Sequence, residues 1–214
     1  GLVKKTPLSE LSRVQPAGVP VILLQEGDRL VGAELTDGCH SVMLFSDAGR
    51  AARFDENDVR PMGRLSKGVG GMKVKGGSVI AMLVAGEEDS GKQVLTATEN
   101  GYGKRTPIDE YTLHGRNTQG MIAIAQTERN GRLVGACLVA DDDEIILLSR
   151  KGKLVRTPVE SIRTCSRAAQ GVTLIGLKDD SLVSVTRVDA PAETDEASAA
   201  PEPEAAPAEG TADG

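Results

Sequence analysis

The residues of this 214-residue chain that could do chemistry are lysines and arginines that return at matching places about every fifty residues. One group follows a recurring glycine, as at Lys4 and Lys5, and another lies four residues before a second recurring glycine, as at Arg64. Both side chains bind phosphate. A charge that recurs once per repeat should lie on the same rim of every repeat, so the pattern predicts a curved basic stripe that follows a phosphate backbone. The candidate DNA-binding residues are Lys4, Lys5, Arg13, Arg50, Arg53, Arg60, Arg64, Lys67, Lys104, Arg105, Arg116, Lys153, Arg156, Arg163 and Arg167.

The nucleic acid that fits this stripe is duplex DNA. The chain has only two phenylalanines, two tyrosines and no tryptophan, too few for the stacking platforms of single-strand binders. Recognition should therefore use the backbone and shape of the duplex rather than its base sequence. The recurring glycines lack a Cβ, so we expect backbone N–H groups there to come close to phosphate. A second possibility is a propeller that binds protein, whose basic side chains are merely solvated.

Other site chemistry finds little support. The only histidines are His40 and His114, and the cysteines Cys39, Cys137 and Cys165 lie far apart without a CxxC pair. This spacing predicts reduced thiols and neither a disulfide framework nor a zinc site. The segment 86–92 nearly matches a phosphate-binding loop, but Gln93 replaces the hydroxyl that magnesium needs and the following run looks like a strand. The sequence thus predicts no catalytic residue, no metal site and no cofactor in this chain.

The elements that must position these residues form a fourfold repeat. Its opening glycines are Gly1, Gly49, Gly101 and Gly152, and its second glycines are Gly18, Gly68, Gly120 and Gly171. Repeats of this length are units that bury their apolar faces against their neighbours. We divide the body, residues 1–188, into repeats at about 1–48, 49–100, 101–151 and 152–188.

Each repeat consists of short apolar blocks separated by turn residues. In the first repeat the blocks 19–24 and 30–35 are examples, and in the third 121–125, 133–140 and 144–149 follow one another. Such blocks read as strands joined by tight turns. With the opening segment as a fourth strand, the pattern predicts an all-β, propeller-like array of four-stranded blades. The segments 7–11, 107–111 and 158–162 could each form only one helical turn.

The formal net charge of −6 hides a division of the chain. Residues 189–214 contain no lysine or arginine and eight acidic residues, which leaves 25 basic against 23 acidic residues in the body, a net of +2. This Ala-, Pro- and Glu-rich tail is typical of a disordered segment. It either aids solubility or competes, within the molecule, with DNA for the basic face.

The run TENGYGKRTPIDEY (98–111), the run FDENDVRPMGR (54–64) and the spaced R-x-x-x-G turns resemble the C-terminal domain of the bacterial DNA gyrase A subunit. The resemblance covers residues 1–188. It implies a β-pinwheel of about six blades, about four of them present here, that exchange strands with their neighbours. It also implies that duplex DNA wraps around a basic outer rim to support negative supercoiling by an ATP-dependent type II topoisomerase.

The resemblance extends to partners and context. It implies association with the rest of the A subunit, and with the B subunit in an A2B2 heterotetramer, in the bacterial cytoplasm at the nucleoid and away from membranes. ATP and magnesium would be used elsewhere in that enzyme. The family's QRRGGKG box is missing, which suggests that this chain is a fragment starting after it. Val14 stands where the other repeats have arginine, so the first repeat should bind DNA most weakly. The related C-terminal domain of topoisomerase IV is the alternative.

Overall fold

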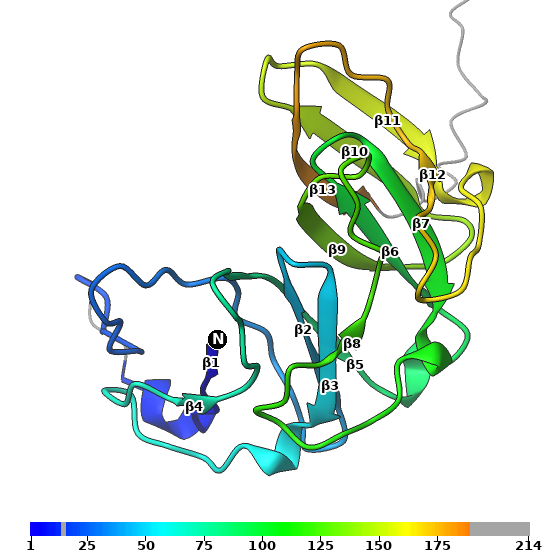
Figure 1. Cartoon of the computed structure of the whole chain (residues 1–214). Helices are drawn as coiled ribbons and strands as arrows, with labels where there is room; N and C mark the ends of the chain where they lie inside the picture. The colour runs from blue at the N-terminus through cyan, green and yellow to red at the C-terminus, as the bar shows by residue number, and fades with distance from the viewer. Residues whose placement is uncertain (14–15, 189–214) are drawn as a thin grey trace, which may run out of the picture.

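The computed structural model describes residues 1–13 and 16–188 (Figure 1). It confirms the all-β prediction, because the helical elements in these residues are single 3-10 turns. Three of those turns fall on the predicted segments. The strands are β1 (Leu2–Val3), β2 (Ser41–Ser46), β3 (Arg50–Asp55), β4 (Val69–Gly70), β5 (Val79–Ala85), β6 (Gln93–Thr98), β7 (Tyr102–Pro107), β8 (Met121–Ile122), β9 (Leu133–Val139), β10 (Glu144–Ser149), β11 (Leu154–Pro158), β12 (Val172–Thr173) and β13 (Leu182–Val188). The turns are η1 (Leu8–Leu11), η2 (Glu56–Asp58), η3 (Glu87–Asp89), η4 (Ile108–Glu110) and η5 (Val159–Ser161).

The sheets are built around three tight antiparallel hairpins, β2–β3, β6–β7 and β10–β11. A later strand pairs with the first strand of each hairpin: β5 with β2, β9 with β6, and β13 with β10. A short strand of the following repeat pairs with the second strand of two hairpins, β8 with β3 and β12 with β7, and β4 pairs in the same way with β1 in a separate two-stranded sheet. Neighbouring repeats therefore exchange strands. The predicted repeat boundaries lie in the hairpin turns, so each four-stranded sheet contains residues of three sequence repeats and each smaller sheet contains residues of two.

The buried side chains form three clusters, each between two successive sheets. Successive side chains of a strand point to opposite faces of the sheet. The central strands therefore contribute side chains to the clusters on both faces of their sheet. In β2, Met43 and Phe45 belong to one cluster and Leu44 to another. In β6, Val94 and Leu95 are divided in the same way. Since full burial of such a side chain contributes about 1.5–3 kcal/mol, each sheet depends on its neighbours for stability.

The prediction of strands at 19–24 and 30–35 is wrong. The structure has no strand between residues 16 and 40. In later repeats the counterparts of 30–35 are β9 and β13, which pair with the first strand of an earlier hairpin. The described residues before Leu30 provide no such strand, so the backbone of this segment lacks a partner. Leu30 is 56% exposed, whereas its counterparts Leu133 and Leu182 are 1% exposed.

The segment that resembles a phosphate-binding loop has a different structure. After Gly86 the chain forms the single turn η3, which Asp89 closes by accepting a hydrogen bond of 2.9 Å from the Gly86 N–H. The strand β6 then begins at Gln93, where a nucleotide-binding loop needs a helix. The rejection of nucleotide binding at this segment is thus supported by the fold.

The three cysteines are free thiols. Burial raises the pKa of the Cys137 thiol to about 12, so this thiol stays protonated at neutral pH. In the described part of the chain, none of the helical turns has the length and apolar character needed to cross a bilayer. Val14 and the acidic tail, residues 189–214, lie outside the described residues.

Candidate nucleic-acid interface

The prediction that Lys104 belongs to an exposed stripe is wrong. Its side chain is fully buried, and its ammonium group donates a hydrogen bond of 2.7 Å to Oγ1 of Thr106. The reason is its place in β7, which lies inside a sheet whose two faces pack on neighbouring sheets. Burial lowers the pKa of Lys104 to about 8. This lysine is therefore out of reach of a phosphate.

The prediction that Arg105 binds DNA is also corrected, because its guanidinium group faces the next repeat rather than solvent. The side chain is only 9% exposed and forms an ion pair with Asp141. Its Nε donates a hydrogen bond of 2.6 Å to the carbonyl oxygen of Ile162, and Nη2 donates one of 3.4 Å to that of Glu160. Both acceptors belong to the turn η5 and the residue that follows it. Arg105 thus fastens β7 to the 3-10 turn of the following repeat.

The same contact recurs at two earlier junctions between repeats. Nη1 of Arg53 donates to the carbonyl oxygens of Ile108 and Tyr111 at 3.2 and 3.1 Å, around η4. Nζ of Lys5 lies 2.7 Å from Oε2 of Glu56, the first residue of η2. The backbone follows the same pattern, because the carbonyl oxygens of Lys5, Arg53 and Arg105 each accept a hydrogen bond from an N–H group of the following repeat. We call Lys5, Arg53 and Arg105 the junction residues.

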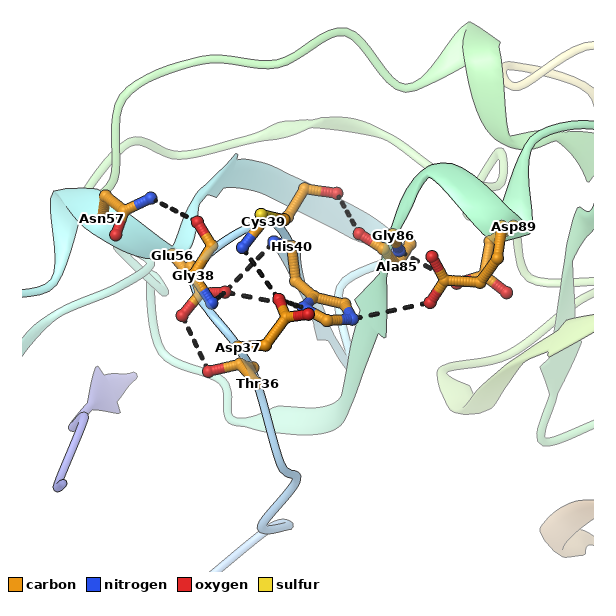
Figure 2. A network of polar contacts seen from close by, with 12 residues as sticks. Thr36, Asp37, Gly38, Cys39, His40, Glu56, Asn57, Ala85, Gly86 and Asp89 are labelled. Atoms are coloured by element: carbon orange, nitrogen blue, oxygen red, sulfur yellow. Dashed lines mark hydrogen bonds and ion pairs between the residues drawn. The ribbon is translucent and has the colours of Figure 1, made fainter. Parts of the chain in front are cut away.

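Glu56 is a residue of this junction that the sequence analysis missed. Its carboxylate is 1% exposed and accepts hydrogen bonds from Thr36 Oγ1 and from the backbone N–H groups of Gly38 and His40, as Figure 2 shows. Burial alone would raise the pKa of Glu56, but the hydrogen bonds from Lys5, Thr36 and the two N–H groups outweigh it and lower the pKa to about 2. A signal was present, because Leu8, Ile108 and Val159 make this position apolar in the other repeats.

The second basic group makes contacts in the opposite direction, toward the preceding repeat. Arg116 donates to the carbonyl oxygens of Asp58 and Gly70 at 3.0 and 2.9 Å. Arg167 donates to those of Glu110 and Ile122 at 3.2 and 2.7 Å. Both side chains remain half-buried and keep part of their guanidinium surface in solvent.

Three of the four second glycines, Gly68, Gly120 and Gly171, also serve the junctions, whereas a Cβ on Gly18 would meet no atom within 4 Å. A Cβ on Gly120 would lie 2.3 Å from the carbonyl oxygen of Ala51, and one on Gly171 would lie 2.4 Å from that of Gly103. The space beside each glycine is therefore filled by the preceding repeat. Both glycines have positive φ angles, 66° and 83°, which other residues rarely adopt. They allow two repeats to approach each other closely.

The charges that remain available lie in the loops between each 3-10 turn and the next short strand. We call residues 59–68 and 162–171 the basic loops. Arg60 and Arg163 occupy equivalent places in them, and Lys67 lies in the first. The side chains of all three are exposed and form no hydrogen bond or ion pair with described residues. Arg13, also exposed, lies in the corresponding loop of the first repeat. In the third repeat Thr112 replaces the exposed arginine.

Of the other predicted residues, all but Arg64 use their side chains in contacts with the protein. Lys4 donates to the carbonyl oxygens of Val21 and Arg64. The remaining contacts join Arg50 to the carbonyl oxygens of Gln119 and Gly120, Lys153 to that of Gly176, and Arg156 to the carboxylate of Glu144. Arg64 is half-buried, and its side chain forms no bond to described residues.

The arrangement places unpaired positive charge in the basic loops of the second and fourth repeats, along one edge of the array. In Figure 1 the turns η1, η2, η4 and η5 follow one another along the lower and right-hand edge of the array, and the basic loops begin where η2 and η5 end. Arginine and lysine side chains displayed in this way can bind the phosphates of an extended polyanion.

Comparison with known proteins places these features in a family. A family model described as the DNA gyrase C-terminal domain, beta-propeller, matches residues 1–37, 40–85, 92–137 and 143–189. The DNA gyrase A subunit of Pseudomonas aeruginosa is 48% identical over 198 residues, which cover 92% of this chain and 21% of that protein. The DNA gyrase A subunit of Escherichia coli K12 is 44% identical over 197 residues, 92% of this chain and 22% of that protein. The chain thus spans about a fifth of the length of these relatives.

Two solved structures share the fold over most of the chain. The C-terminal domain of a DNA topoisomerase IV superposes with a TM-score of 0.83 at 27% identity, covering 89% of this chain and 59% of that one. The C-terminal domain of a DNA gyrase A superposes with a TM-score of 0.72 at 34% identity, covering 80% and 58%.

Proposed function

Because this chain belongs to the DNA gyrase C-terminal domain family, we propose that its body binds duplex DNA through the phosphate backbone, along the basic loops, and bends it. The observation that carries the proposal is the equivalent placement of Arg60 and Arg163, which are exposed and unpaired among described residues two repeats apart. Neither side chain is used to hold the repeats together, although the backbone carbonyl oxygen of Arg163 accepts a hydrogen bond of 3.3 Å from the Arg105 N–H. The half-buried Arg64, Arg116 and Arg167 lie in the same loop of successive repeats and would add contacts along the path.

The geometry of the junctions supports bending as well as binding. The junction residues and the second glycines fix each repeat against the next, so the binding loops keep a set spacing. Smooth bending of a 20–30 bp duplex costs on the order of 1–6 kcal/mol, which several charge-assisted phosphate contacts offset. A rigid array imposes its own curvature on the DNA, whereas a flexible array would follow the DNA.

The family relationship extends the proposal to the whole enzyme. We propose that the chain works as part of the A subunit of DNA gyrase, with the B subunit in an A2B2 heterotetramer. There the bent DNA would be presented for ATP- and magnesium-dependent strand passage and negative supercoiling by other parts of the enzyme. We place it at the nucleoid in the bacterial cytoplasm, and we give the chain itself no catalytic role. The acidic tail would compete with DNA for the basic loops.

The test removes three unpaired charges and measures the salt dependence of binding to a duplex. In the variant R60Q/K67Q/R163Q, the slope of log K against log salt should become less steep by about 2.7, since each phosphate contact contributes about 0.9. The matched control K73Q/K75Q/K178Q removes the same charge from exposed lysines outside the basic loops and should keep the original slope. Equal slopes in the two variants would contradict the proposed path.

The two alternatives predict different outcomes. A propeller that binds protein would show no salt-sensitive affinity for duplex DNA. The C-terminal domain of topoisomerase IV is less well supported, because identity is 48% with the gyrase A subunit of P. aeruginosa and 27% with the topoisomerase IV domain.

A further inference from the structure

Three side chains outside the candidate interface converge just before β2. Asp37, His40 and Glu56 offer ligand atoms that all lie within 4.8 Å of one another. Nδ1 of His40 is 2.9 Å from Oδ1 of Asp37 and 3.6 Å from Oε1 of Glu56 (Figure 2). Two atoms bound to one tetrahedral zinc ion at about 2.0 Å lie about 3.3 Å apart. The two distances from Nδ1 lie on either side of that value, so Nδ1 has the spacing of a metal ligand relative to each carboxylate.

The histidine has the orientation of a metal-binding imidazole. Its other nitrogen, Nε2, lies 3.5 Å from Oε1 of Glu88. A metal-binding histidine commonly directs its second ring nitrogen, as an N–H group, to a carboxylate. With the proton on Nε2, the lone pair of Nδ1 faces two carboxylate oxygens and needs a cation between them.

A proton on Nδ1 does not fill the place of a cation between Nδ1 and the two carboxylate oxygens well. Nδ1 is buried and has no hydrogen-bond partner in the part of the chain that the structure describes. Oδ1 of Asp37 is close enough to accept a hydrogen bond, so it must lie off the direction of an Nδ1–H bond. Two ligands of the same metal ion show this relation, because both point at the ion and not at each other.

The carboxylates are held in place by the backbone. Glu56 is fixed by the N–H groups of Gly38 and His40, and Oδ1 of Asp37 accepts a hydrogen bond of 3.0 Å from the N–H group of Cys39. Three carboxylates, those of Asp37, Glu56 and Glu88, surround the imidazole, against the single ammonium of Lys5. The local charge therefore favours a divalent cation, and the mixed nitrogen and oxygen donors suit zinc and its neighbours.

We propose that Asp37, His40 and Glu56 bind a divalent transition-metal ion of the zinc type. The ion would tie the loop at 36–40 to η2, at the junction that Lys5 also holds. The site is independent of DNA contacts, so its test does not depend on the proposed DNA binding.

The test titrates Zn²⁺ into the ¹⁵N-labelled chain and follows the two imidazoles by NMR. His40 and His114 are the only histidines, so H114Q assigns both sets of signals. At one equivalent of Zn²⁺, the Nδ1 signal of His40 should move to its metal-bound position while Nε2 keeps its proton. The His114 signals should stay unchanged. Equal, unsaturated shifts of both histidines, or a doubly protonated His40 that Zn²⁺ does not displace at pH 7, would overturn the proposal.

Variants at exposed carboxylates separate binding from folding. The Asp37 side chain is 72% exposed and that of Glu88 is 68% exposed, so D37N and E88Q should fold normally. E88Q should weaken Zn²⁺ binding about 10-fold or more by releasing the imidazole, and D37N, which changes a direct ligand, should weaken it further. D109N, at an exposed carboxylate of η4, is the matched control and should bind Zn²⁺ like the parent. Unchanged affinity in D37N would contradict the site.

Discussion

Replacing Arg105 with methionine should destabilise the body by about 3 kcal/mol. The substitution removes the hydrogen bond of 2.6 Å to the carbonyl oxygen of Ile162 and leaves that acceptor unpaired. A hydrogen bond from a charged donor contributes about 1.5–3 kcal/mol. The longer bond to Glu160 and the ion pair with Asp141, whose side chain is 74% exposed, add at most about 1 kcal/mol. The loss should therefore be well above the effect of removing a surface charge.

Urea unfolding followed by circular dichroism measures this loss. With a slope of about 2.5 kcal/mol per M, a loss of 3 kcal/mol lowers the midpoint by about 1.2 M. R156M is the matched control, because Arg156 holds the same place in the next repeat but is 51% exposed and pairs only with Glu144. Its midpoint should fall by less than about 0.4 M, which corresponds to the 0–1 kcal/mol of a surface ion pair. Equal effects of R105M and R156M would refute the role of Arg105 at the junction.

Three further predictions concern buried charge, close backbone approach and the tail. Since burial lowers the pKa of Lys104 from 10.5 to about 8, the unfolded chain holds more protons than the fold between these values, and stability should rise from pH 8 to pH 10. K104M should remove this pH dependence and increase the free energy of unfolding at pH 7 by about 1 kcal/mol or more, which raises Tm. A lower Tm, or stability that still rises from pH 8 to pH 10, counts against this prediction. G120A should cost more than about 3 kcal/mol in urea unfolding, against about 1–2 kcal/mol for G91A, because both glycines have positive φ angles but only a Cβ at 120 meets backbone. Deleting residues 189–214, which carry eight acidic charges, should raise affinity for duplex DNA most at low salt, and identical salt titrations of the two chains would reject this.

The architecture could be predicted from the sequence because its causes are local. Short apolar blocks and turn glycines determine strands and hairpins within a few residues of themselves, and their fourfold recurrence indicates the array. The strand prediction fails in the first repeat for a nonlocal reason. The segment at 30–35 has strand-like residues, but the described residues offer no strand to pair with it. Exposed Leu30 and buried Leu133 have nearly the same local sequence.

The roles of the basic residues could not be predicted in the same way. A basic residue can recur in every repeat for two physical reasons. Every junction between repeats needs the same contacts, and every segment of a DNA path along the repeats would need the same phosphate contacts. Arg53 and Arg105 recur for the first reason, and Arg60 and Arg163 satisfy the conditions of the second. Sequence spacing cannot separate these origins, whereas burial and hydrogen-bond partners can. Glu56 was missed because it departs from the repeat, in which its counterparts are apolar.

The central claim, that duplex DNA bends along the basic loops, is tested most directly by the topology of a closed plasmid. The chain is bound to nicked circular DNA, the nick is sealed, and the linking number is read after the protein is removed. The chain should shift the linking number in proportion to the amount bound, the control K73Q/K75Q/K178Q should do the same, and R60Q/K67Q/R163Q at equal occupancy should shift it less. An unchanged linking number with saturating chain, or an undiminished shift in the basic-loop variant, would contradict the account.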